Sequence, residues 1–211
     1  MKRCPKILVG LSLLLVFGIA SAADQRADIG TVVRVQKNAT ATYKLDTRPL
    51  AQQTSVWFED LLQTGPGARL AVTLADDTEL TLGENGSLLV DSFVYSPEND
   101  KGELALQVIQ GAFLFVGGGI EKTSAAEVSI QTQVGTLGIR GTTVWGGPID
   151  NGFGVLTLAG EVVVSNSAGS VTLNPGEGTM IQGPDQAPQA VKVWPQEKVD
   201  RAVATISFAD Q

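Results

Sequence analysis

Few side chains in this sequence could do chemistry, because histidine is absent from all 211 residues and cysteine occurs once, as Cys4 in the basic N-terminal head. Imidazole is the commonest general base, and a thiolate is the usual sulfur nucleophile and metal ligand. A Ser-His-Asp triad, a thiol nucleophile and an ordinary zinc site are therefore excluded. Carboxylate chemistry remains possible, since two acidic side chains suffice for glycoside hydrolysis.

Acidic residues gather around one predicted hairpin, where Asp76 and Asp77 form the turn and Glu84 and Asn85 follow in the next turn. Asp and Asn are common in turns because their side chains bond to the nearby backbone. Their spacing does not match a calcium-binding loop. We therefore predict no metal site, no catalytic residue and no cofactor.

Three tryptophans, Trp57, Trp145 and Trp194, could form a platform on which sugar rings stack. Tryptophans of β domains usually lie in the core or at its edge, however, because their burial removes a large apolar area from water. A polysaccharide-binding or carboxylate-based, glycan-active domain stays open as an alternative function.

The segment 128–145 alternates apolar and polar residues and contains a single arginine, Arg140. Glycines interrupt it at every third position, as Gly135, Gly138 and Gly141. This spacing is not that of a dinucleotide-binding loop, and no helical pattern follows to supply a phosphate-binding N-terminus. The guanidinium of Arg140 could brace adjacent strands or contact a partner, since it offers five donors. The candidate binding residues are Arg140, Thr142 and Trp145.

Short strands separated by glycine and polar turns follow one another through residues 28–182, at a spacing of about 8 to 12 residues. This pattern predicts an all-β fold of many short strands in a Gly-rich, sandwich- or solenoid-like domain. Within it we expect a hairpin of residues 30–35 and 39–45, and another of 70–74 and 80–82. We also expect a turn at 159–161. The loops 96–102 and 117–124 are predicted to be exposed, the latter also flexible.

Residues 183–211 are predicted to form a Pro-rich linker, a strand and a short C-terminal helix. Pro195 stands at a favourable first helical position, and Val199, Val203 and Ile206 follow at helical spacing.

The N-terminus has the pattern of a secretory signal peptide, predicted to be residues 1–22: a basic head, the apolar run 7–19 and small residues at 20–23. The run is short for a membrane span, which needs about 20 apolar residues. Cleavage would remove three of the 15 basic residues and none of the 22 acidic ones, leaving a net charge of −10. We expect a periplasmic or secreted protein without stable membrane insertion, and the acidic surface disfavours nucleic acid as a partner.

The order of the motifs resembles that of the FecR domain family over about residues 28–182. The matching steps are Gly30-Thr-Val32, Phe58-Glu-Asp60, Thr64-Gly65, the strand 70–74, Asp76-Asp77, Leu82-Gly83 with Ser87, Gly111-Ala-Phe113, Arg140-Gly-Thr142 and Gly160-Glu-Val162. Well-known members of the family cross the inner membrane, sense an outer-membrane transporter and regulate a sigma factor. The short head before the apolar run implies instead the free-standing periplasmic form.

From these observations we expect a non-enzymatic β domain that binds another envelope protein, in signalling or envelope assembly. Exposed strand edges or the two loops named above would supply the contact surface. A purely structural role in an envelope assembly is a further possibility.

Overall fold

The structure is a computed structural model that describes residues 26–209, so the predicted signal peptide lies outside the described residues. In chain order the strands are β1 (Asp28–Gln36), β2 (Ala39–Tyr43), β3 (Asp46–Pro49), β4 (Ser55–Trp57), β5 (Leu61–Thr64), β6 (Arg69–Leu74), β7 (Glu79–Leu82), β8 (Ser87–Ser96), β9 (Lys101–Gln110), β10 (Phe113–Val116), β11 (Ala125–Thr132), β12 (Gly135–Ile149), β13 (Gly152–Asn166), β14 (Gly169–Leu173), β15 (Glu177–Ile181) and β16 (Lys192–Val193). The helices are two short 3-10 turns, η1 (Pro97–Asn99) and η2 (Ile120–Lys122), and one α-helix, α1 (Gln196–Ala204).

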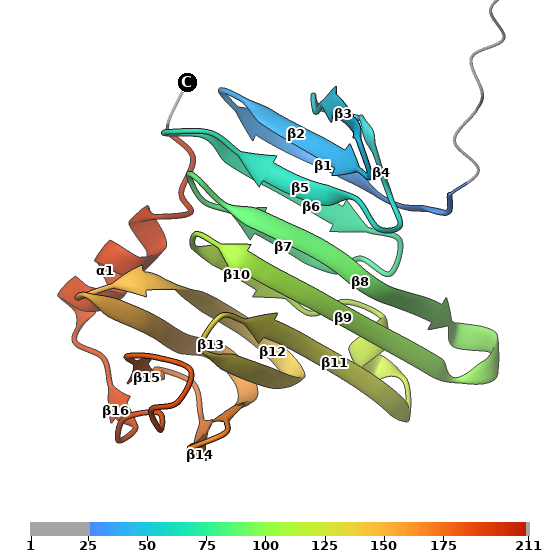
Figure 1. Ribbon diagram of the computed structural model, residues 1–211. Coiled ribbons are helices and arrows are strands. Elements are labelled where there is room, and N and C mark those ends of the chain that lie inside the picture. The colour runs from blue at the N-terminus through green and yellow to red at the C-terminus, as the bar shows by residue number, and fades with distance from the viewer. Residues whose placement is uncertain (1–25, 210–211) are drawn as a thin grey trace, which may run out of the picture.

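The strands form one curled sheet whose two halves face each other. Its order is β3-β2-β5-β8-β9-β11-β12-β10-β7-β6-β1-β4, with β13 to β16 joined on through β12. We call β3-β2-β5-β8-β9-β11 the first layer and β10-β7-β6-β1-β4 the second layer. Figure 1 shows the strands stacked from β1 and β2 at the top to β12 and β13 near the bottom. The prediction of an all-β fold of many strands with a short C-terminal helix is confirmed.

The core lies between the two layers because most of their strands bury alternate residues, although β3 at the end of the first layer buries none. In β6 the burial alternates residue by residue, with Leu70, Val72 and Leu74 inward. In β9, Leu104, Leu106 and Val108 do the same from the opposite layer. Both sets belong to one continuous cluster of buried apolar side chains. Burial of this apolar surface, at roughly 25 cal/mol per Å², supplies the main stabilising free energy.

The predicted hairpins have different outcomes. β6 and β7 pair antiparallel as expected. β1 and β2 do not pair with each other: β1 pairs with β4 and β6, and β2 pairs with β3 and β5. The turn between them, with Lys37 at φ 59°, carries the chain from the second layer to the first. The alternation of apolar and polar residues predicts which side chains face inward. It does not predict which layer each strand joins.

β12 and β13 form a long antiparallel hairpin that belongs to both layers. The first half of β12 pairs with β11 of the first layer, and its second half pairs with β10 of the second. Its register with β13 shifts between Arg140 and Thr143, where the hairpin crosses from one layer to the other. The turn predicted at 159–161 is wrong, because Gly160 lies inside β13, opposite the two residues Gly141 and Thr142 that form a bulge in β12. Gly160 has φ 75°, and a Cβ there would lie 2.1 Å from the carbonyl oxygen of Gly141, so the crossing needs glycine.

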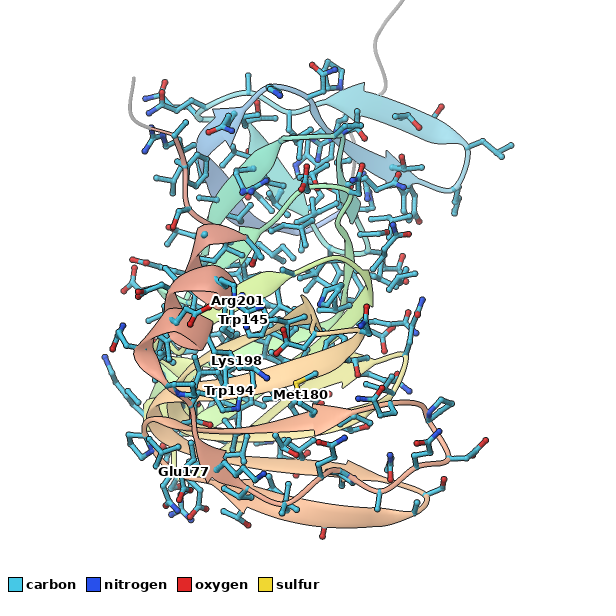
Figure 2. All side chains as sticks on the ribbon, turned by 90° about the vertical axis from the view of Figure 1, so that its left-hand side faces the viewer. Trp145, Glu177, Met180, Trp194, Lys198 and Arg201 are labelled. Carbon is cyan, nitrogen blue, oxygen red and sulfur yellow. The ribbon has the colours of Figure 1, made fainter. Side chains whose placement is uncertain are left out.

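A second, smaller apolar cluster joins α1 to the outside of β12 and β13. The fully buried Trp145 contacts the ring of Trp194 edge-on, with 6.1 Å between ring centroids. Ala202 and Ile206 of the helical region complete the cluster. Figure 2 shows Trp145, Trp194 and Lys198 together beside α1. Within residues 26–209, no helix has the length and hydrophobicity needed to cross a membrane.

The loop predicted to be flexible at 117–124 is packed in its first half. Ile120 is fully buried in the main core. A Cβ on Gly118 would lie 2.3 Å from the backbone nitrogen of Thr78 and 2.4 Å from the carbonyl oxygen of Asp76. The prediction of a flexible segment is wrong for its first half, because Gly118 allows two backbones to approach closely.

Candidate functional site

The candidate site is a groove of about 400 Å³ on the outer surface, where β11 and β12 separate. Pairing between them ends at Ser129 and Gly138. β11 continues beyond that point beside β9, and β12 bends away with β13 toward the second layer. The groove is lined by Glu103, Leu104, Ala105, Ala126, Glu127, Val128, Ser129, Gly138, Ile139, Arg140, Glu161 and Val163. The divergence of two strands thus creates a depression in the sheet.

Arg140 is exposed in this groove. Its guanidinium makes no hydrogen bond and no ion pair with any residue of the described range 26–209. The bracing role considered for Arg140 is therefore absent from this geometry, although the side chain lies among Glu103, Glu127 and Glu161. The residue is placed where a partner could reach it.

Thr142, the second candidate, is buried and performs the bracing. Its hydroxyl donates to the carbonyl oxygen of Glu161 at 3.0 Å and accepts from the backbone N–H of Arg140 at 3.1 Å. Its own N–H donates to Oε2 of Glu121 at 3.1 Å, and its carbonyl accepts from the N–H of Gly117 at 2.9 Å. These bonds satisfy backbone groups that the bulge removes from the strand ladder.

Arg140→Ala is expected to change the free energy of unfolding by no more than about 0.5 kcal/mol, as for an ordinary surface substitution. Thr142→Val should cost about 1 to 3 kcal/mol, because it leaves buried backbone groups without their partner. Urea denaturation of both variants checks this contrast. A larger loss for Arg140→Ala than for Thr142→Val would restore the bracing role to the arginine.

Two carboxylates lie beneath the bulge. Asp76 is buried and accepts from the hydroxyl and the N–H of Thr78 at 2.8 and 3.1 Å, and from the N–H of Ile120 at 3.0 Å. Burial raises the pKa of Glu121 above its ordinary value, and the charge of Asp76 adds to the rise, although the N–H groups of Thr142 and Gly141 oppose it. Oε1 of Glu121 is buried without a hydrogen-bond partner among the described residues.

The raised pKa of Glu121 predicts a pH dependence of stability. The folded protein binds this proton more tightly than the unfolded chain, so the associated stability is complete below pH 4.5 and is lost as pH rises through the folded pKa. The substitution Glu121→Gln should therefore raise the free energy of unfolding, relative to the unaltered protein, by more at pH 7.5 than at pH 4. Urea titrations at both values measure this, with the exposed Glu98→Gln as control. Equal effects at the two pH values would contradict it.

Trp145, the third candidate, is fully buried, and its Nε1 donates to Oγ1 of Thr205 at 3.0 Å. Trp194 is 7 % exposed beside it. Trp57 lies elsewhere, under the guanidinium of Arg48, which is 3.9 Å from the ring centroid. The structure therefore brings Arg140 and Thr142 together at the crossing but places Trp145 in the helix-side cluster. The three tryptophans do not share an exposed face.

Sequence reasoning missed a buried cluster around Asp60, which is 1 % exposed. Arg26 donates to Oδ1 of Asp60 at 2.8 Å, Arg48 donates to Oδ2, and the N–H of Trp57 donates to Oδ2 at 2.9 Å. The guanidinium of Arg26 also stacks over Tyr43 at 3.8 Å. In the sequence Asp60 is one step of the Phe58-Glu-Asp60 motif, and nothing local indicates that two arginines distant in sequence bond to it.

The acidic residues of the two turns, for which no metal site is predicted, have roles in the backbone structure of those turns. Glu84 accepts from the N–H of Gly67 at 2.8 Å, and Asp77 occupies a left-handed turn position at φ 65°. Across residues 26–209, no three acidic side chains gather in a way that could hold a metal ion.

Comparisons with known proteins agree on the fold. A family model described as "FecR protein" matches residues 60–181. Two crystal structures of a "putative anti-sigma factor" from Parabacteroides distasonis resemble the chain, with TM-scores of 0.53 and 0.52 and identities of 16 % and 17 %. Each match covers 66 % of this chain and 62 % of the other, so the chain spans less than two thirds of those proteins. No curated protein matches the chain.

Proposed function

The chain belongs to the FecR protein family, and from this premise we propose that it is a non-enzymatic, periplasmic or secreted β domain that binds another envelope protein. The exposed guanidinium of Arg140 carries this proposal. Its two neighbours in the Arg-Gly-Thr motif serve the fold, Gly141 at the crossing and Thr142 as the brace. Arg140 is the member of the motif whose side chain is exposed, in a groove whose walls carry three more charges.

A role in signalling or envelope assembly agrees with several observations. Proteins of similar fold include one named as a putative anti-sigma factor, and the family model matches 122 of the residues here, from 60 to 181. The N-terminal pattern of a basic head and apolar run supports export from the cytoplasm. The sequence has no histidine, the commonest general base, and this favours a binding role over a catalytic one.

Site-directed photocross-linking in the native envelope tests the proposal. A photoreactive residue in place of Ser129, which lines the groove, should give a discrete protein adduct, whereas one in place of the exposed Glu98, which does not line the groove, should not. Arg140→Ala should reduce the adduct at position 129 about tenfold, the loss expected when a close charge contact is removed. Lys122→Ala, which removes an exposed cation outside the groove lining, serves as the matched control. An adduct that Arg140→Ala leaves unchanged would overturn the proposal.

A further inference from the structure

The groove contains an open edge of the sheet. Over its whole length β11 pairs with β9 in parallel, from Ala125 beside Lys101 to Thr132 beside Val108. On its other side it pairs with β12 only from Ser129 to Thr132. In the described part of the chain, residues 125–128 therefore have a strand neighbour on one side only. Figure 1 shows β11 as a long strand beside β9, with β12 turning away from it.

This edge contains neither proline nor lysine, two of the residues with which proteins usually protect a free edge, and Glu127 is its single charged residue. Its residues are Ala125, Ala126, Glu127 and Val128, and the first three are exposed. Four residues of β-strand span about 13 Å, at about 3.3 Å per residue. A short extended segment could therefore pair with the backbone of residues 125–128, and the groove beside this edge has space for it.

The charges on the groove indicate what such a segment carries. Glu103 and Glu127 stand side by side in the parallel register, a like-charge pair that costs stability unless a cation approaches it. Arg140 stands beside Glu161 in the register with β13. No ion pair joins these three glutamates to a cation within residues 26–209. Three acidic groups against one basic group make the groove complementary to a mainly basic segment, with one carboxylate placed to contact Arg140.

We infer that the groove binds an extended, basic segment of a protein partner as an added strand along residues 125–128 of β11. This inference rests on the proposed function, because it names the binding mode and the partner chemistry of the same site. Outward side chains of the added strand would alternate, placing lysine or arginine near Glu127 and Glu103. Main-chain hydrogen bonds to the open edge would supply affinity, and the charges would supply specificity.

A second copy of this chain is a poorer occupant than a basic segment. The chain carries 22 acidic and 15 basic residues, so two copies repel each other. Sedimentation at the concentrations used below should find no self-association that residues 125–128 mediate.

A labelled six-residue peptide of alternating lysine and valine, capped at both ends, is the probe. Fluorescence anisotropy in 0.15 M salt should show saturable binding, weakened about tenfold by Glu127→Lys and unchanged by Glu98→Lys outside the groove. At saturation, amide exchange of residues 125–128 should slow about tenfold or more, as in a paired strand. A peptide of alternating lysine and proline has the same charge but cannot pair along its length, and it should not bind.

Three outcomes would overturn the inference. These are equal binding of the lysine-proline peptide, unchanged binding by Glu127→Lys, and unchanged exchange at residues 125–128. Dimerisation through the same edge, without peptide binding, would overturn it in favour of a second copy. If the Arg140-dependent cross-link forms while the peptide fails, strand addition fails and the proposed function stands. If the cross-link is also absent, both fail.

Discussion

Trp145→Ala is expected to lower the free energy of unfolding by about 4 kcal/mol, within the range for removing a large aromatic side chain from a core. The indole is fully buried and packs edge-on against Trp194. It also donates the hydrogen bond to Thr205 that holds the end of the helical region against the sheet. The substitution therefore removes apolar contacts and the main anchor of α1 together.

Urea denaturation followed by far-ultraviolet circular dichroism measures this loss. Limited proteolysis should show cleavage near α1 before the sheet unfolds, because the helix loses its principal contact. Leu45→Ala, which truncates a side chain that is 98 % exposed, is the control and should leave both measurements unchanged. A loss below about 1 kcal/mol would be less than the usual cost of truncating a buried aromatic side chain. It would show that other contacts hold α1 against the sheet.

Asp60→Asn is expected to cost about 3 kcal/mol, because it removes the negative charge from between two arginines in a buried place. Arg26 and Arg48 bond to opposite oxygens of the carboxylate, and their side chains are 12 % and 23 % exposed. Since each arginine can still reach some water, the cost should lie at the lower end of the range for breaking a buried ion pair. Chemical denaturation at pH 7 measures it.

Asp150→Asn provides the matched control for this change. Asp150 also faces two cations, Lys198 at 2.9 Å and Arg201 at 2.7 Å, but its own side chain is 41 % exposed, against 1 % for Asp60. The hydrogen bond from Arg201, followed by that from Lys198, lowers the pKa of Asp150 to about 2. Asparagine also tolerates its left-handed backbone, at φ 49°. The loss should be much smaller than for Asp60→Asn, and equal losses would show that burial does not matter at Asp60.

Much of the fold follows from local sequence patterns, while the pairing does not. The alternation in residues 70–74 predicted which side chains face inward. Pro195 predicted the start of α1 to within one residue, since Pro195 is the N-cap and Gln196 is the first helical residue. The β1 to β2 connection was read as a hairpin because two neighbouring strands with a turn usually pair. Whether they pair or cross to the other layer depends on contacts with β6 and β5, which lie far along the chain.

The candidate site shows the same division. Arg140 stands out as the single charge of the glycine-interrupted segment 129–145, and its place in the groove remains a candidate binding position. Its bracing role was assigned by residue type, whereas the shorter Thr142 does this because a threonine hydroxyl can both donate and accept at the bulge. The groove itself could not be predicted from the sequence, because it forms where the pairing of β11 with β12 ends and the two strands diverge.

The hairpin of β12 and β13 has a consequence for how the molecule opens. In a solenoid each repeat contacts only its neighbours, so the ends can fray one repeat at a time. Here the β12–β13 hairpin pairs with β11 of the first layer and with β10 of the second. The two layers therefore cannot separate while this hairpin stays folded. Local unfolding should therefore be confined to the strands farthest from the hairpin, β3 and β4, and the part of the domain beside the groove should open most slowly.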